Sequence, residues 1–159
     1  MSISPRKLTE ADFDWVLALS AGHEVETGKL DRTKLAQMAA AAYSITVIGE
    51  RGCYLITFDQ DSAYDSPNFI WFRARYPRFV YVDRIVVDPA VRGAGFARAL
   101  YEDFFARARA DGHKLACCEI NLDPPNPGSD AFHARMGFAE VGQAKLANGK
   151  SVRYLTRSL

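Results

Sequence analysis

The sequence is poor in cysteine, and it has neither a long apolar run nor an excess of one sign of charge. The three cysteines, two of them the adjacent Cys117 and Cys118, match neither a disulfide framework nor the spacing of a metal site. We therefore expect buried, reduced thiols, no metal and a cytoplasmic protein. No run approaches the ~18 apolar residues of a membrane span, and the first residues lack the apolar core of a signal peptide. Twenty basic against nineteen acidic residues, a net charge of +1, predict no nucleic-acid or membrane partner.

The 159 residues, 48% of them hydrophobic, are enough for one domain with a real core, and we expect a single domain over 1–159. Strands linked by hairpins come first, and a strand–helix–strand crossover lies in the middle. This order predicts an α/β (α+β) fold: a mixed, mostly antiparallel sheet of about six or seven strands flanked by about four helices. The strands are expected at 2–8, 43–48, 53–58, 79–87, 115–122, 138–146 and 151–155, and the helices at 9–20, 31–42, 97–110 and about 129–137.

A glycine turn at Arg92–Ala97 is the most informative segment. It follows the β-branched strand at 79–87, which ends at Asp88-Pro89, and it precedes a helical pattern. Such a junction directs free backbone N–H groups at one point, with the helix dipole behind them, so it predicts an anion site, most simply for a phosphate.

Two common phosphate-binding patterns do not fit this turn. The P-loop requires Lys-Ser/Thr after the glycines, which is missing, and the dinucleotide fingerprint requires glycine or alanine where the sequence has Arg98. A third pattern, Arg/Gln-x-x-Gly-x-Gly/Ala, fits completely. With this turn the sequence resembles the GNAT superfamily of acyl-CoA-dependent N-acyltransferases.

Other segments carry the same resemblance. They are Ile85–Pro89 before the turn, the stretch from Asn126 to Gly137-Phe138 after the next strand, and the opening Leu8–Asp12. The resemblance extends over essentially the whole chain, most clearly from 79 to 140, and it implies a GNAT-like fold with acetyl-CoA as the cofactor.

The resemblance also implies how coenzyme A is bound. The turn would hold the pyrophosphate by backbone N–H groups, with Arg92 or Arg98 adding charge, and Asn126 would contact the pantetheine or phosphate arm. The strand before the turn would pair with that arm, and a bulge would free an N–H near Ile85 or Val86 for the thioester carbonyl. The expected cofactor residues are Ile85, Val86, Val87, Arg92, Gly93, Ala94, Gly95, Phe96, Ala97, Arg98 and Asn126. For the turn, the alternative is that its glycines serve backbone geometry alone.

Two residues are candidates for moving protons. Asp83 is expected on the same strand face as Ile85, and the resemblance implies that it is the base, directly or through water; alternatively it only pairs with Arg84 or Arg78. His133 stands where the family most often has a tyrosine that protonates the leaving thiolate. An imidazole can supply that proton, but it can also merely pack or hydrogen-bond the thiol.

The resemblance implies that the aromatic and basic segment before the strand at 79–87 forms the acceptor pocket or its lid. Arginines beside aromatic rings suit an acceptor that bears a carboxylate. The alternative is a packed lid or a homodimer contact with solvated arginines. The residues concerned are Trp71, Phe72, Arg73, Arg75, Tyr76 and Arg78.

The predicted function is transfer of an acetyl or longer acyl group to a primary amine by direct attack in a ternary complex. The acceptor, a small molecule or a peptide, is left open by the sequence. The alternative is a non-catalytic acyl-CoA-binding or sensing module, which the missing tyrosine favours. Because the cysteines lie off the motif, no covalent acyl-enzyme is expected.

Overall fold

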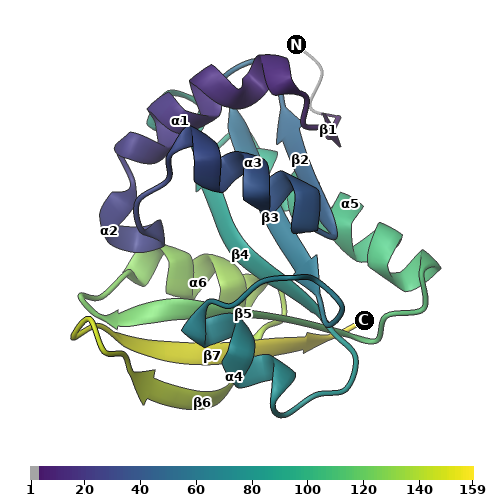
Figure 1. Cartoon of the computed structure of the whole chain (residues 1–159), viewed down its shortest axis with the longest axis vertical. Coiled ribbons are helices and arrows are strands. Elements are labelled where there is room, and N and C mark those ends of the chain that lie inside the picture. Colours follow the sequence, from purple (N-terminus) through teal and green to yellow (C-terminus); the bar gives the residue numbers. More distant parts are fainter. Residues whose placement is uncertain (1–3) are drawn as a thin grey trace.

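The computed structural model describes residues 4–159, so the part of the first predicted strand at residues 2 and 3 lies outside the described residues. Within the described residues, the centre of the fold is a seven-stranded mixed sheet in the order β1-β2-β3-β4-β5-β7-β6, in which only β4 and β5 run parallel (Figure 1). This confirms the predicted sheet. The strands are β1 (Arg6–Lys7), β2 (Ser44–Ile48), β3 (Cys53–Asp59), β4 (Val80–Val87), β5 (Leu115–Asp123), β6 (Ala139–Lys145) and β7 (Ser151–Ser158).

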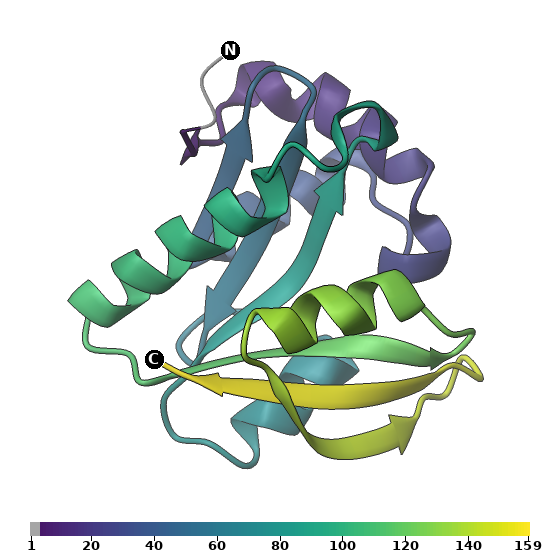
Figure 2. The same ribbon diagram turned by 180° about the vertical axis from the view of Figure 1, so that it is seen from behind.

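Helices cover both faces of this sheet and create two apolar cores. Helices α1, α3 and α4 lie on one face, and α5 and α6 lie on the other, which Figure 2 shows from behind. None of the described helices combines the length and the apolar composition needed to cross a bilayer. The helices are α1 (Phe13–Ala21), α2 (Glu24–Thr27), α3 (Arg32–Ala41), α4 (Pro67–Arg73), α5 (Phe96–Ala110) and α6 (Pro127–Arg135), with 3₁₀ turns at Glu10–Asp12 and Pro89–Val91.

Two of these helices, α2 and α4, fall in segments for which the sequence predicts neither a helix nor a strand. Helix α4 begins with a strong local signal, because the Ser66 side chain accepts a hydrogen bond from the N–H of Phe69 at 3.2 Å and Pro67 occupies the first turn. Its aromatic residues Phe69 and Phe72 are fully buried. The aromatic residues of the segment between β3 and β4 therefore form the buried face of an amphipathic helix.

The feature that positions the site is a fork between β4 and β5. The two strands pair only where Val80–Val82 lie beside Ala116–Cys118. Beyond that point they diverge, and Figures 1 and 2 show the widening gap between them. The rest of β4 therefore has no neighbouring strand on its β5 side.

The bulge expected in β4 is present, but it lies earlier than predicted. Thr57 pairs with Val82 and Ile56 pairs with Arg84, so Asp83 is the extra residue. Because a bulge interrupts the alternation of side chains, the prediction that Asp83 and Ile85 share a face is wrong. Asp83 contacts Tyr64 on the α1–α4 face, whereas Ile85 packs in the α5–α6 core.

Candidate active site

The glycine turn leaves the beginning of α5 open. Gly93 and Gly95 have positive φ values of 84° and 82°, a conformation that favours glycine, and Gly95 is the residue that caps α5. No side chain accepts a hydrogen bond from the first turn of the helix, and nothing lies within 4 Å of the Cβ position of either glycine. The free N–H groups and the helix dipole therefore face open space, as an anion site requires.

A cavity of about 620 Å³ extends from this turn along β4 to α6. We call it the donor cavity. Of the residues predicted to bind the cofactor, all but Ala94 line it: Ile85, Val86, Val87, Arg92, Gly93, Gly95, Phe96, Ala97, Arg98 and Asn126.

Three of the residues predicted to bind the cofactor, Ala94, Arg98 and Asn126, have contacts that bear on their roles. The N–H of Ala94, which is not among the lining residues, donates to the carbonyl of Val91 at 3.3 Å, so this amide is already used inside the turn. Arg98 makes only an exposed ion pair with Glu102 at 3.5 Å, which is easily exchanged for a ligand. Asn126 caps α6 through Oδ1, which accepts from the N–H of Ser129 at 3.4 Å, and this leaves its Nδ2 for the cavity.

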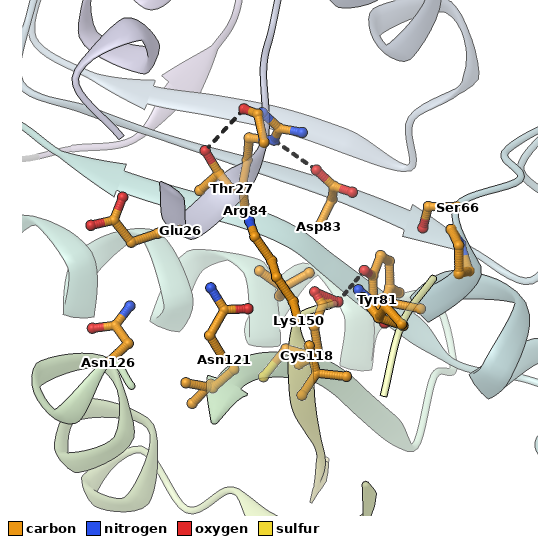
Figure 3. A pocket seen from close by; sticks show the side chains of 18 of the residues that line it. Glu26, Thr27, Ser66, Tyr81, Asp83, Arg84, Cys118, Asn121, Asn126 and Lys150 are labelled. Carbon is orange, nitrogen blue, oxygen red and sulfur yellow. Dashed lines mark hydrogen bonds and ion pairs between the residues drawn. The ribbon is translucent and has the colours of Figure 1, made fainter. Parts of the chain in front are cut away.

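A second cavity, of about 450 Å³, lies on the α1–α4 side of the fork, and we call it the acceptor cavity (Figure 3). The first turn of α4, the bulge of β4, the diverging part of β5 and the β6–β7 turn form its walls. The donor and acceptor cavities share the lining residues Glu26, Thr27, Ile85, Asn126, Ser129 and His133. They therefore meet at the fork.

Asp83 faces the acceptor cavity, but both of its carboxylate oxygens are engaged. Oδ1 accepts from the hydroxyl of Tyr64 at 2.5 Å, and Oδ2 accepts from Nε of Arg84 at 2.7 Å. The Asp83 and Arg84 side chains are only 7% and 2% exposed. Asp83 therefore pairs with Arg84, which is the alternative that the sequence offered. To take a proton, this carboxylate would first have to give up one of them.

Sequence reasoning missed a second carboxylate at the fork. Glu119 lies on β5 directly after Cys118, the last residue paired with β4, and it accepts a hydrogen bond from the hydroxyl of Tyr81. Burial, reinforced by the negative charge of Asp83, raises the pKa of Glu119 to about 8. A carboxylate with this pKa can act as a general base near neutral pH. The only signal in the sequence was a single acid inside the apolar strand at 115–122.

His133 lines both cavities but has both ring nitrogens engaged. Nδ1 lies 2.8 Å from the carbonyl oxygen of Ser129, which can only accept, so the proton is assigned to Nδ1. Nε2 then accepts from the hydroxyl of the buried Tyr101 at 2.6 Å. Burial lowers the pKa of His133, which favours this neutral form. The neutral ring has no spare proton for a leaving group.

The aromatic and basic residues predicted to bind the acceptor lie outside the lining of the acceptor cavity. Trp71 stacks on Tyr154 with ring centroids 4.1 Å apart, Arg75 lies over Trp71 at 3.8 Å, and Phe72 is fully buried. Arg73 lies over the ring of Phe69, Tyr76 stacks near Phe72, and Arg78 donates to the carbonyl of Asp111. These residues do not line the cavity because α4 packs Trp71 and Phe72 against the sheet, and the other basic and aromatic residues lie at or beyond the end of this helix. Tyr64, Ser66, Pro67 and Asn68, just before and within its first turn, line the cavity instead.

Comparison with known proteins agrees with this geometry. The family model described as "Acetyltransferase (GNAT) family" matches residues 39–138. The chain belongs to the GNAT acetyltransferase family. The predicted family, fold and cofactor are thereby confirmed: this GNAT protein is an N-acetyltransferase that uses acetyl-CoA.

Solved structures of the same fold are similar over nearly the whole chain. The Ard1 structure from Thermoplasma volcanium has a TM-score of 0.77 at 12% identity and covers 98% of this chain and 97% of its own. The ribosomal-protein-S18-alanine N-acetyltransferase from Escherichia coli has a TM-score of 0.68 at 14% identity, covering 98% and 92%. The putative acetyltransferase yncA from Salmonella typhimurium, solved with acetyl-CoA, has a TM-score of 0.70 at 20% identity, covering 98% and 93%. No curated protein sequence matches the chain significantly.

Proposed function

We propose that this GNAT enzyme transfers the acetyl group directly to a primary amine held in the acceptor cavity, with both substrates bound together. The observation that carries the proposal is the meeting of the two cavities at the fork between β4 and β5. A donor bound from the α5–α6 face and an amine bound from the α1–α4 face can approach each other there. No covalent carrier is needed, and the three cysteines are buried and free.

The donor cavity fits coenzyme A through backbone groups. The open N–H groups of the turn and of the first turn of α5 would hold the pyrophosphate, with Arg92 and Arg98 at the rim. The unpaired side of β4 from Ile85 to Val87 would hold the pantetheine arm as an added strand would be held. Acetyl-CoA, once bound, supplies a thioester carbonyl that an amine can attack.

We assign the base to Glu119. An amine acceptor is protonated in water and must lose a proton before it attacks. Glu119 lines the acceptor cavity at the fork, and its raised pKa lets it accept that proton on a carboxylate oxygen while Tyr81 donates to it. Asp83, the base predicted from the sequence, would then fix Arg84 and, through its charge, help to raise the pKa of Glu119.

The role of His133 as the acid remains a prediction with a clear structural requirement. The ring must gain a second proton, or the Tyr101 hydroxyl must turn away from Nε2. In its present contacts His133 holds Ser129, whose hydroxyl lies 3.2 Å from Nδ1 and lines both cavities. The same contacts are the observation that favours the second candidate, an acyl-CoA-binding module without turnover.

The proposal is tested by measuring the release of free thiol from acetyl-CoA in the presence of different acceptors. The acceptors are amino acids, polyamines, aminoglycosides and peptides with a free N-terminus. Turnover with any class, without acetylation of Cys117 or Cys118, supports direct transfer. Saturable binding of acetyl-CoA with no turnover across the panel would support the binding module instead. The proposal includes a cytoplasmic location, which the sequence predicts, and it leaves open the homodimer contact that the sequence offered as an alternative.

A further inference from the structure

Two lysines from separate elements line the acceptor cavity. Lys34 comes from the first turn of α3, and Lys150 comes from the turn between β6 and β7. Within residues 4–159, neither lysine forms an ion pair with a carboxylate of the protein. Each ammonium group is therefore available to an anionic group that enters the cavity.

Lys150 also closes one side of this cavity. Figure 3 shows its side chain extending past Cys118 and Asn121 toward the α2 segment. Its Nζ donates to the carbonyl of Val25 at 2.7 Å, and Nδ2 of Asn121 donates to the same carbonyl at 3.3 Å. These two bonds join the β6–β7 turn and β5 to α2. A polypeptide running between α2 and the β6–β7 turn would have to break both, whereas a compact molecule beneath them would not.

The remaining charged groups of the cavity do not neutralise the lysines. Arg84 and Asp83 compensate each other in a buried ion pair, and Glu26 is exposed on α2, where it lines both cavities. Glu119 is protonated below its pKa of about 8, so it carries little negative charge at neutral pH. A simple ammonium ion would therefore meet more positive than negative charge, and a substrate with its own negative group would be favoured.

We propose that the acceptor is a compact amino-acid-like molecule whose carboxylate is bound by Lys150 and Lys34 while its primary amine faces Glu119. This assignment rests on the proposed function and names the substrate class of the same site. An ammonium group has three donors, and Lys150 uses one of them on Val25, so two are left for a carboxylate without breaking the closure. The cavity volume of about 450 Å³ suits a molecule of amino-acid size.

Matched pairs of acceptors test the proposal. Phenylalanine is compared with phenethylamine, leucine with isoamylamine, and each amino acid with its methyl ester and with a tripeptide that begins with it. We expect kcat/KM by thiol release to be at least about tenfold higher for the free amino acids, as expected for a charged hydrogen bond. Calorimetric titration of the same ligands into the enzyme–CoA complex gives the preference without turnover.

Substitution of the lysines links this preference to the cavity. Lys150→Met and, independently, Lys34→Met keep the alkyl chain and remove the charge, so each should shrink the preference toward threefold or less. Lys145→Met, on the exposed face of β6, should leave it unchanged. A preference for decarboxylated amines, esters or tripeptides would overturn the amino-acid assignment while leaving acetyl transfer intact. Absence of turnover with every acceptor would overturn the proposed function and this assignment together.

Discussion

At the scale of single residues, the site depends on an acid whose character comes from its surroundings. Glu119 is an ordinary glutamate in the sequence, and its raised pKa arises because the fork buries it near Asp83. Asp83 and His133 could be recognised from their positions relative to motifs. Glu119 could not, because its environment is assembled from β4 and β5 and does not exist before the sheet forms.

Glu119→Gln should lower kcat/KM about 10²–10⁴-fold, the usual contribution of a general base. In the unmodified enzyme, kcat/KM should rise with pH through about 8, because the base works only after it has lost its proton. The variant should lose this limb of the pH profile. Glu10→Gln, at an exposed position outside both cavities, is the matched control. A limb near pH 8 that persists in Glu119→Gln would exclude Glu119 as the base.

Although Glu119→Gln should lower activity, it should raise the thermal stability of the protein at alkaline pH. Because the pKa of Glu119 is raised in the folded state, folding binds a proton between the unfolded pKa near 4.5 and about 8, and stability is lost as pH rises through this window. Glu119→Gln removes this loss, so its melting temperature should exceed that of the unmodified enzyme at pH 9. Thermal unfolding at pH 5 and pH 9 measures the effect. An equal difference at both pH values would contradict the linkage.

At the scale of elements, the glycine turn and α4 differ in how far their sequences determine their roles. The turn is predictable because a tight turn at a helix start needs a local glycine pattern, and Gly93 and Gly95 show the positive φ values this implies. For α4, aromatic residues and arginines fit equally well in a pocket or in a core. Only contacts with distant residues such as Tyr154 decide between them.

Gly95→Ala should weaken coenzyme A binding about tenfold or more. A Cβ there is strained by roughly 1–2 kcal/mol at a φ of 82°, and it adds a methyl group at the open end of α5. Gly112→Ala is the matched control, since Gly112 has a φ of 87° and lies past the opposite end of the same helix. Both variants should lose similar thermal stability. Calorimetry should show the loss of affinity only for Gly95→Ala, and equal affinities would argue against the turn as the pyrophosphate site.

Gly142→Ala should destabilise the protein without affecting the acceptor KM. A Cβ at Gly142 would lie 2.6 Å from Cζ2 of Trp71, so the indole must move off Tyr154. Such overpacking lowers the free energy of unfolding by about 1–3 kcal/mol. Each kcal/mol lowers the melting temperature by about 2–4 °C. Gly22→Ala, with its nearest neighbour at 3.7 Å, should be nearly neutral. A large rise in acceptor KM for Gly142→Ala would instead indicate that Trp71 contributes to the acceptor site.

At the scale of the whole molecule, sequence order was enough for the mixed sheet but not for the fork. Hairpin turns and one crossover predict the antiparallel pairs and the single parallel pair. The length over which β4 and β5 pair depends on the bulge at Asp83 and on how the helices pack on each face, which no local pattern encodes. The two cavities and their meeting point were therefore not predictable.

Coenzyme A should slow amide hydrogen exchange along β4 from Ile85 to Val87 and at the start of α5. These amides lie beside the donor cavity, and β4 has no neighbouring strand on its β5 side there. The paired segment Val80–Val82 should change little and serves as the internal reference. Exchange measured with and without coenzyme A checks this. Protection spread evenly over the sheet would indicate global stabilisation instead of binding at the fork.

The fork also bears on self-association. An unpaired strand side is normally a template on which another chain can add its own strand, and proteins usually blunt it with charge, proline or a cover. In this fold that side of β4 faces β5 across the fork, at an internal position of the sheet and not at its outer edge. The outer strand β6 is the one long edge in the described chain left to solvent, and its side chains include Glu140, Gln143 and Lys145. In the proposed binding mode, the donor therefore uses an internal strand side, whereas strands of neighbouring molecules add most easily at an outer edge.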